Sequence, residues 1–235
     1  RVHGAFVLPR VSYAEALEMA YFGAKVVHPK TMTPAMARGI PILIKNTLRP
    51  EAHGTEISRK TDISGRTVKT VTVIENLALM SLEGNGMMGV PGMASRLFGA
   101  LARSDVNVVM ISQASSEHSI CFVIQKEAVA SAEKAIAEEF AHELDLKTVE
   151  GISVQENVAI IAAIGEGMKG TPGISGKLFG ALGKNKINIL AVAQGSSEMN
   201  ISLVVTQSEA TKALNVIHGA FHLSAGNVHL VVIGK

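Results

Sequence analysis

Two long spans of the chain show the same order of strand-like and helix-like spacing of apolar residues. The first opens with the apolar run at residues 77–82, continues through a helical pattern at 93–103, and ends with apolar side chains at helical spacing over 129–140. The second span starts with the apolar run at 158–164 and repeats this order. We therefore predict two successive β-α-β-β-α units.

The two spans are also copies of one another, displaced by a constant 81 residues without a gap. Between residues 73–123 and 154–204, 22 of 51 positions are identical. The shared blocks include Leu-Phe-Gly-Ala-Leu, Glu-Asn, Pro-Gly and Gln-x-Ser-Ser-Glu. Identity of this extent indicates a duplicated module, called here the first and the second repeat.

Each repeat needs a fourth strand to complete a split βαβ sandwich. Residues 152–156 can supply it to the first repeat, whereas the second repeat has only residues 71–75, which precede the first. A crossover of that strand would tie the repeats into one unit. The predicted fold class is α+β, with two ferredoxin-like βαββαβ domains in tandem and interleaved strands.

The first 47 residues follow another pattern, helix-strand-helix-strand. Ser12 and Glu15 form a capping-box signature, and Gly39 closes a helix that Thr33-Pro34 is expected to open. The expected elements are a helix at 14–22, a strand at 25–27, and a strand at 40–44. Residues 49–69 are polar and rich in turn formers, and they are predicted to be a linker or hairpin at a domain boundary.

Composition narrows the class of protein. With 235 residues, 47% of them hydrophobic, the chain has material for two or three compact units. A net charge of +2 with scattered lysines and arginines gives no reason to expect nucleic acid as a partner. No apolar run reaches the roughly 20 residues of a membrane span. The single cysteine, Cys121, excludes an internal disulfide and fits a reducing cytoplasm.

Both repeats contain a G-x-G-x-x-G sequence between a strand and a helix, at residues 84–89 and 165–170. Such loops can hold the pyrophosphate of a dinucleotide. Three features oppose that interpretation: a proline at each helix start, no acidic residue at the end of the next strand, and a tight turn where a crossover helix is needed. The residues concerned are Pro91, Pro172, Gln113 and Gln194.

A small anionic ligand fits the same loops better. Exposed N–H groups at a helix N-terminus suit one carboxylate. Gln113 and Gln194, at the ends of the adjacent strands, offer a donor and an acceptor for an ammonium or hydroxyl group. Asn107 and Asn188 open those strands. The alternative is that the glycines only permit a turn and the asparagines only cap strand entry.

The sequence gives little support for a metal site or for nucleophilic catalysis. His218 and His222 stand four residues apart on a predicted helix, but no third ligand accompanies them, so no metal site is expected. No serine, cysteine or histidine set typical of nucleophilic catalysis is evident in residues 70–225.

These motifs together resemble the aspartate kinase family. The end of its kinase domain is matched by Val-Ser-Tyr-Ala-Glu-Ala-Leu from Val11, Phe-Gly-Ala-Lys-Val-Val-His-Pro from Phe22, and Ile-Pro-Ile-Leu-Ile-Lys-Asn-Thr from Ile40. The repeats are similar to the two ACT domains that follow it. The tail at 228–235 is similar to the first Rossmann strand of a homoserine dehydrogenase, which favours the bifunctional aspartokinase–homoserine dehydrogenase type and an excised piece of a larger protein.

The resemblance implies five parts. They are residues 1–48 as the end of an amino-acid kinase domain, 49–69 as linker, 76–156 as the first ACT domain, 70–75 plus 157–224 as the second, and 225–235 as a truncated dehydrogenase start. It also implies a cytoplasmic homodimer paired through its ACT domains, without nucleic acid or membrane. Lysine regulation of a single-function kinase, a dinucleotide-binding oxidoreductase, and a second repeat that serves only as dimer scaffold remain alternatives.

The resemblance further implies threonine as effector, with two sites of similar design and unequal affinity. The expected contacts are Met88, Gly89, Pro91, Gly92, Asn107 and Gln113 in the first repeat, and Lys169, Gly170, Pro172, Gly173, Asn188, Ile189 and Gln194 in the second. Lys25 matches a position on the nucleotide side of the kinase site. The parent is expected to use ATP with Mg and NAD(P); this chain alone is expected to bind no cofactor and to be catalytically inactive.

Overall fold

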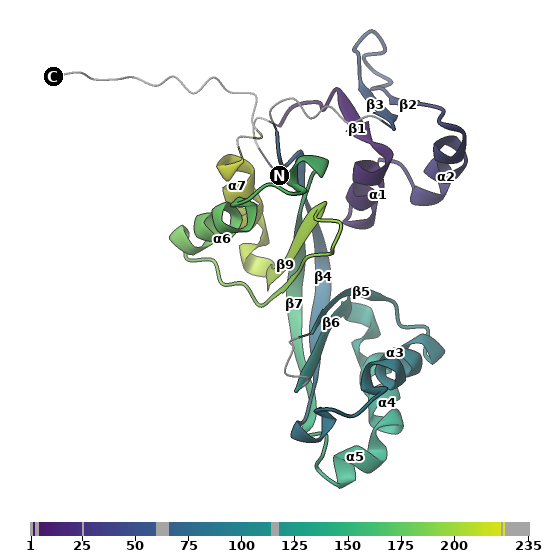
Figure 1. Ribbon diagram of the computed structural model, residues 1–235, viewed down its shortest axis with the longest axis vertical. Helices are drawn as coiled ribbons and strands as arrows, with labels where there is room; N and C mark the ends of the chain where they lie inside the picture. Colours follow the sequence, from purple (N-terminus) through teal and green to yellow (C-terminus); the bar gives the residue numbers. More distant parts are fainter. Residues whose placement is uncertain are drawn as a thin grey trace, which may run out of the picture.

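The computed structural model describes residues 2, 5–24, 26–59, 66–113, 118–221 and 223. They form a small N-terminal unit and a larger body built around two long strands (Figure 1). Lys25, the Ser-Ser-Glu turn of the first repeat and the tail at 224–235 lie outside the described residues. Among the described helices, none is long and apolar enough to cross a membrane.

The N-terminal unit is a three-stranded sheet with two helices. Its elements are β1 (Arg10–Ser12), α1 (Tyr13–Tyr21), α2 (Pro29–Arg38), β2 (Ile42–Ile44) and β3 (Thr55–Ser58). Strand β3 lies in the centre, parallel to β1 and antiparallel to β2. Of the two predictions for residues 49–69, the hairpin is confirmed, since β2 and β3 pair antiparallel. The linker is wrong over Thr55–Ser58, because β3 completes this sheet and buries Ile57 against Val11 and Met32.

The helix ends in this unit differ from expectation in one place. The Ser12–Glu15 capping box forms as predicted, and Gly39 ends α2 in the left-handed conformation (φ 67°). However, α2 begins at Pro29, not at Thr33-Pro34, because the ring of His28 accepts a bond from the N–H of Lys30 and Pro29 needs no partner at the first helical position. The strand expected at 25–27 is also wrong where it is described, since Val26 and Val27 lie in a turn and a bend.

The larger body has a six-stranded sheet in the order β5-β6-β4-β7-β9-β8. The first repeat contributes β4 (Thr70–Glu83), α3 (Met93–Arg103), β5 (Val108–Gln113), β6 (Ser119–Gln125), α4 (Val129–Glu139) and α5 (Ala141–Asp145). The second contributes β7 (Gly151–Ile164), α6 (Ile174–Lys184), β8 (Ala191–Ala193), β9 (Asn200–Thr206) and α7 (Ala210–Ala220). Short 3-10 turns lie at Asn85–Met87, Lys126–Ala128, Glu166–Met168 and Gln207–Glu209.

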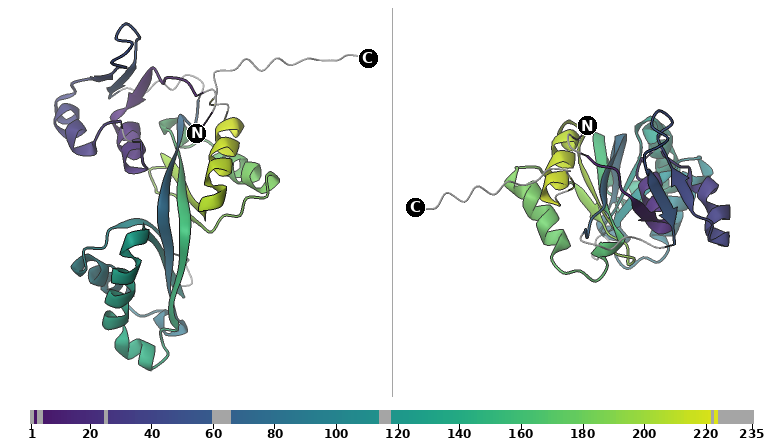
Figure 2. Two further views of the ribbon diagram at one scale, coloured as in Figure 1. Left: turned by 180° about the vertical axis from the view of Figure 1, so that it is seen from behind. Right: turned by 90° about the horizontal axis from the view of Figure 1, so that it is seen from above.

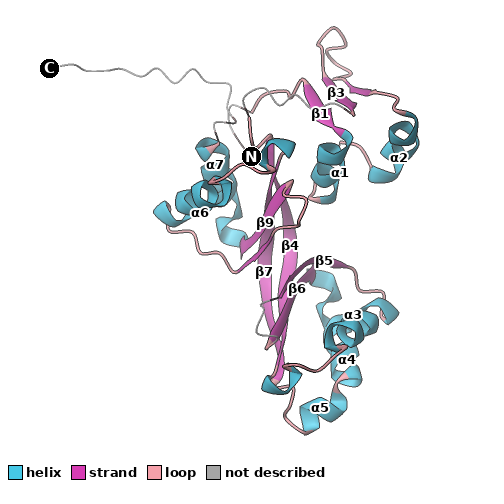
Figure 3. Ribbon diagram, in the orientation of Figure 1, coloured by secondary structure: helices cyan, strands magenta, loops and turns pink. Residues whose placement is uncertain are grey.

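Strands β4 and β7 run antiparallel through both repeats (Figure 3). The first half of β4 pairs with the end of β7, from Thr70 with Ile164 to Ile74 with Ile160. The second half of β4 pairs with the start of β7, down to Glu83 with Gly151. Each repeat thus receives its fourth strand from the chain segment preceding the other, which confirms the predicted interleaving.

The change of partner occurs at a kink that the pattern of apolar residues did not indicate. Asn76 and Asn157 have positive φ values of 62° and 56°, and the β4–β7 register shifts there. Asparagine tolerates this conformation better than most residues. The side chain of Gln207 bonds both the N–H and the side-chain oxygen of Asn76. The repeated Glu-Asn block therefore marks a structural junction.

Helices α3, α4 and α5 flank one half of the β4–β7 ribbon, and α6 and α7 flank the other (Figure 2). Each helix pair covers its own core, around Phe122 in the first repeat and Ile161 in the second. A third core on the sheet joins Leu77, Ile160 and Phe22, and Phe22 belongs to the N-terminal unit. Apolar packing therefore connects all three parts.

Candidate functional site

The first two glycines of each G-x-G-x-x-G loop are needed for backbone packing. A Cβ atom on Gly84 would lie 2.5 Å from the carbonyl oxygen of Thr148, and one on Gly165 would lie 2.4 Å from that of Thr67. Thr148 and Thr67 lead into β7 and β4, so the glycines make room for the incoming fourth strand. Backbone fills the place that a pyrophosphate would need. The structure thus opposes the dinucleotide interpretation.

The later glycines of the loops face open space. Gly89 and Gly92 have φ values of 69° and 88°, and Gly170 and Gly173 have 65° and 89°. A Cβ atom at any of them would meet no atom within 4 Å. Backbone conformation, not crowding, requires glycine here. The neighbouring Met88, Pro91, Lys169 and Pro172 are exposed, so the backbone before α3 and α6 is open to a ligand.

One loop already holds a carboxylate. In the second repeat, the N–H of Gly170 donates a 2.7 Å hydrogen bond to Oε2 of Glu198, in the turn between β8 and β9. Glu198 adopts a positive φ of 55°, an uncommon conformation for a glutamate. The loop therefore has the geometry to bind a carboxylate, and Glu198 occupies that N–H in this structure. The matching Glu117 of the first repeat lies outside the described residues.

The polar strand residues are divided between two ends of the sheet. Gln113 pairs with Ile120, whose other neighbour is Leu82, so Gln113 lies level with the end of β4, where the glycine loop begins. Asn107 precedes β5 and lies at the opposite end, on the order of 20 Å away along six residues of strand. In the second repeat, Asn188 and Ile189 precede β8 and Gln194 follows it. The expected cluster of loop, glutamine and asparagine is therefore not formed within one repeat.

The two edge strands nevertheless meet. The hydroxyl of Ser112 on β5 donates a 2.9 Å hydrogen bond to the carbonyl oxygen of Val192 on β8. Gln113 is the last residue of β5 and Gln194 directly follows β8, and both are exposed. Edge strands of the two repeats thus lie next to one another within a single chain.

A buried charge cluster links the second glycine loop to the N-terminal unit. Glu15 on α1 and Lys69 form an ion pair of 3.2 Å, with side chains 0% and 4% exposed. The other oxygen of Glu15 accepts a 2.9 Å bond from the N–H of Glu166, in the 3-10 turn of the second loop. Ser12 also donates to the side chain of Glu166 at 2.7 Å. The first loop has no such contact with this unit among the described residues. The sequence pattern around Glu15 indicated only its role in capping the helix.

Of the two histidines spaced four residues apart, the structure describes one. His218 is buried on α7, and burial lowers its pKa. His222 lies outside the described residues. Within the described part of the chain, no group of three potential metal-ligating side chains is found.

Two βαββαβ units that share a sheet, each with an open glycine turn before its first helix, define a pair of interleaved ferredoxin-like domains. The pattern of the ACT domain matches residues 80–140 and 161–221, and that of the amino acid kinase family matches residues 1–46. The chain belongs to the ACT domain family, as its sequence motifs predict.

Similar proteins extend this assignment. Bifunctional aspartokinase/homoserine dehydrogenase 1 of Arabidopsis thaliana is 44% identical over 239 residues, which is 100% of this chain and 26% of that protein. The Haemophilus influenzae bifunctional enzyme is 41% identical over 99% of this chain and 29% of its own length. The chain thus spans about a quarter of the length of these relatives.

Solved structures agree with this placement. Aspartate kinase of Clostridium acetobutylicum, described as an allosteric enzyme, superposes with a TM-score of 0.85 at 29% identity, over 94% of this chain and 50% of that one. Aspartokinase III of E. coli, in complex with lysine and aspartate in its T-state, gives 0.71 at 28% identity over 91% and 46%.

Proposed function

We propose that this chain is the allosteric region of a bifunctional aspartate kinase and homoserine dehydrogenase, and that it binds threonine for end-product feedback inhibition. The observation that carries this proposal is the Gly170–Glu198 contact, in which an open loop N–H binds a carboxylate. A free amino acid offers the same group. Lysine is the second candidate, because E. coli aspartokinase III has been solved with lysine bound.

The binding groups divide as follows. The effector carboxylate replaces Glu198 at the N–H of Gly170, and the equivalent group in the first repeat is the N–H of Gly89. The side-chain amides of Gln113 and Gln194 bind the ammonium or the hydroxyl group. Asn107 and Asn188 join the sites through a second chain, because an antiparallel edge pair would bring the start of one β5 beside the end of the other. A homodimer through the ACT domains therefore belongs to the proposal.

Inhibition requires that the effector bind one arrangement of the protein more tightly than another. A tenfold preference per site corresponds to about 1.4 kcal/mol. The contact between Glu15 and Glu166 provides a direct route from the second loop to the kinase part, because displacement of this loop would break a buried hydrogen bond.

The parent protein supplies the catalysis in this proposal. Phosphoryl transfer from ATP with Mg to aspartate, and NAD(P)-dependent dehydrogenation, take place in parts that relatives carry outside this region. Lys25 is the nucleotide-side residue proposed within this chain, and the chain alone is proposed to be inactive. We propose the domain limits 76–156 and 70–75 plus 157–224 for the two ACT units. We also propose cytoplasmic localisation, whereas the Arabidopsis thaliana relative is chloroplastic.

A thermal-shift series tests the proposal. Threonine, lysine, methionine and isoleucine are added separately at millimolar concentration, and the melting temperature is recorded. Because a ligand that binds only the folded state stabilises it, threonine is expected to raise the melting temperature and the others are not. A rise with lysine alone would instead favour the second candidate.

A further inference from the structure

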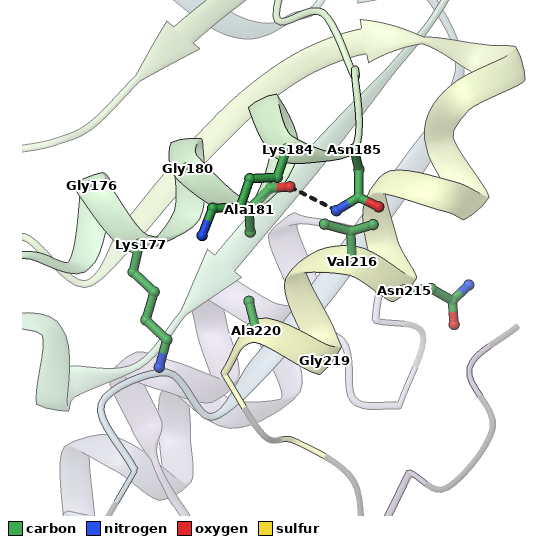
Figure 4. A pocket seen from close by; sticks show the side chains of 10 residues that line it. All are labelled: Gly176, Lys177, Gly180, Ala181, Lys184, Asn185, Asn215, Val216, Gly219 and Ala220. Atoms are coloured by element: carbon green, nitrogen blue, oxygen red, sulfur yellow. Dashed lines mark hydrogen bonds between the residues drawn. The ribbon is translucent and has the colours of Figure 1, made fainter.

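The helices of the second repeat enclose a groove that lies away from its glycine loop. This groove, of about 490 Å³ between α6 and α7, presents Lys177 and Lys184 (Figure 4), and none of the residues that line it belongs to the glycine loop or to the turn before β9. In the first repeat, ion pairs of Arg96 with Glu139, at 3.0 Å, and with Glu143 join α3 to the facing helices. Discrimination between effectors at the loops therefore depends on the side chains that surround the loops themselves.

One position beside the loops differs in chemistry between the repeats. His118 in the first repeat corresponds, at the offset of 81 residues, to Met199 in the second. The N–H of Gly84 donates a 3.0 Å bond to the carbonyl oxygen of His118, and the N–H of Gly165 donates a 2.9 Å bond to that of Met199. These bonds extend the pairing of β6 with β4, and of β9 with β7, by one residue. Both side chains are half-buried, so the repeats present an imidazole and a thioether in the same place.

This position lies beside the groups proposed to bind the effector. Side chains alternate between the two faces of a sheet, so His118 shares a face with Ile120 on β6. Ile120 pairs with Gln113, which makes His118 and Gln113 diagonal neighbours with about 7–8 Å between them. In the second repeat, the residue directly before this position, Glu198, bonds the N–H of Gly170 in the loop. An amino acid held by the loop and the glutamine would thus reach this position.

The imidazole of His118 has a donor to offer such a ligand. Its Nδ1 atom is buried and has no hydrogen-bond partner among the described residues. In the neutral ring one nitrogen carries the proton, and a buried N–H without a partner is rarer in proteins than a bare acceptor. We therefore assign the proton to Nε2. Because the side chain is half-exposed while Nδ1 is buried, the Nε2–H group is the polar group that a ligand can meet.

We propose that His118 determines the specificity of the first effector site for an amino acid with a side-chain hydroxyl group. The loop binds the carboxylate and the side-chain oxygen of Gln113 binds the ammonium, so the Nε2–H of His118 donates to the hydroxyl oxygen. In the second site, the flexible thioether of Met199 packs against a methyl group in the same place. The inference rests on the proposed function, because it names the part of the same effector that each site recognises.

The hydroxyl group then decides the difference in affinity between threonine and its isostere valine. A bound valine excludes water from the N–H of His118 and leaves this donor without a partner. A site built to bond a hydroxyl group rejects the analogue that lacks it, whereas an apolar site discriminates weakly. The first site should therefore prefer threonine to valine by about tenfold or more, and the second site by about threefold or less. This difference agrees with two sites of unequal affinity for threonine.

Calorimetric titration of the chain with L-threonine and with L-valine tests the inference. The Gln194→Ala variant isolates the first site, and the Gln113→Ala variant isolates the second. We expect the Gln194→Ala variant to bind threonine about tenfold or more tightly than valine. The Gln113→Ala variant should bind the two amino acids with affinities within about threefold of one another.

Exchange of the two side chains supplies the decisive comparison. His118→Met, added to Gln194→Ala, should reduce the preference for threonine to about threefold or less, whereas His118→Gln keeps an N–H donor and should keep the preference. Met199→His, added to Gln113→Ala, should raise the preference to about tenfold. His142→Met is the matched control, because His142 is exposed on α5, and it should change neither site.

The outcomes separate this inference from the proposed function. An unchanged preference after His118→Met, or no gain after Met199→His, would overturn the role of His118 while threonine binding, and with it the proposed function, stands. If neither amino acid binds to the parent chain, the proposed function fails and this inference fails with it. Should His118→Met not fold, as its melting curve would show, the gain expected from Met199→His decides the question.

Discussion

The hydroxyl of Ser112 donates a hydrogen bond of 2.9 Å to the carbonyl oxygen of Val192, although their strands stand at opposite ends of the strand order in the sheet. The sheet must therefore curve until β5 and β8 face one another. The third core, which includes Met110, Ile160 and Val204, is covered by this curvature. Ser112 corresponds to Ala193 in the second repeat, which has no hydroxyl to make the same hydrogen bond to β5. The two repeats are therefore not equivalent in their edge contacts.

Glycines in the two halves of the loop should respond differently to alanine. Gly92→Ala introduces strain at φ 88° but no clash, and we expect a loss of about 1–2 kcal/mol in the free energy of unfolding. Gly84→Ala carries no such strain, because Gly84 is extended, but it forces a Cβ to 2.5 Å from the Thr148 carbonyl oxygen. The chain leading into β7 must then shift, and the loss should be larger, roughly 3 kcal/mol. Urea denaturation measures both, and equal losses would contradict the packing role assigned to Gly84.

The ion pair of Glu15 and Lys69 should be sensitive to removal of one partner. Lys69→Met leaves a buried carboxylate without its cation, and we expect a loss of about 3–5 kcal/mol in unfolding free energy. Lys126→Met is the matched control, because Lys126 pairs with Glu156 at 3.1 Å on the surface and its loss should cost under about 1 kcal/mol. Similar losses for the two variants, measured by denaturation, would show that the Glu15 cluster does not anchor the N-terminal unit.

The network of Arg96 should give a pH-dependent contribution to stability. Arg96 lowers the pKa of Glu139 and Glu143 below the ordinary 4.5, so the folded state favours their charged forms. The contribution is present above that value and is lost as the pH falls through the lowered pKa values. Arg96→Met should therefore cost about 1 kcal/mol at pH 7 and much less near pH 3. Denaturation midpoints at both pH values measure this, and a constant difference would refute it.

Glu198 should compete with the effector at the second loop. Its carboxylate occupies the N–H of Gly170, so Glu198→Ala frees this donor and should increase threonine affinity at the second site by about fivefold, near 1 kcal/mol. Glu209→Ala is the control, because Glu209 bonds Thr206 away from the loop. Calorimetric titration measures the change. If the Glu198 variant binds threonine no more tightly than the parent does, the N–H of Gly170 is not the carboxylate site of the effector.

Periodicity predicted the elements that lie within one repeat. Helices α3 and α6 begin and end where the helical pattern does, and the interleaving followed from counting strands. Three further features could be recognised only in the structure. Strand β3 has only four residues, in a polar stretch of sequence, so its sequence does not differ from that of a linker. The sequence does not show that Gly84 and Gly165 make room for Thr148 and Thr67, because these threonines lie far away along the chain. The capping motif already explained a glutamate at position 15, so the sequence provided no reason to expect its contact with Glu166.

Direct titration of the protein with L-threonine in a calorimeter tests whether this chain is a threonine-binding region. We predict saturable binding at two sites per chain of unequal affinity, with one site lost in Gln113→Ala and the other in Gln194→Ala. Both variants should keep the unfolding free energy of the parent, since both side chains are exposed. Absence of heat with threonine, or unchanged binding in both glutamine variants, would contradict it.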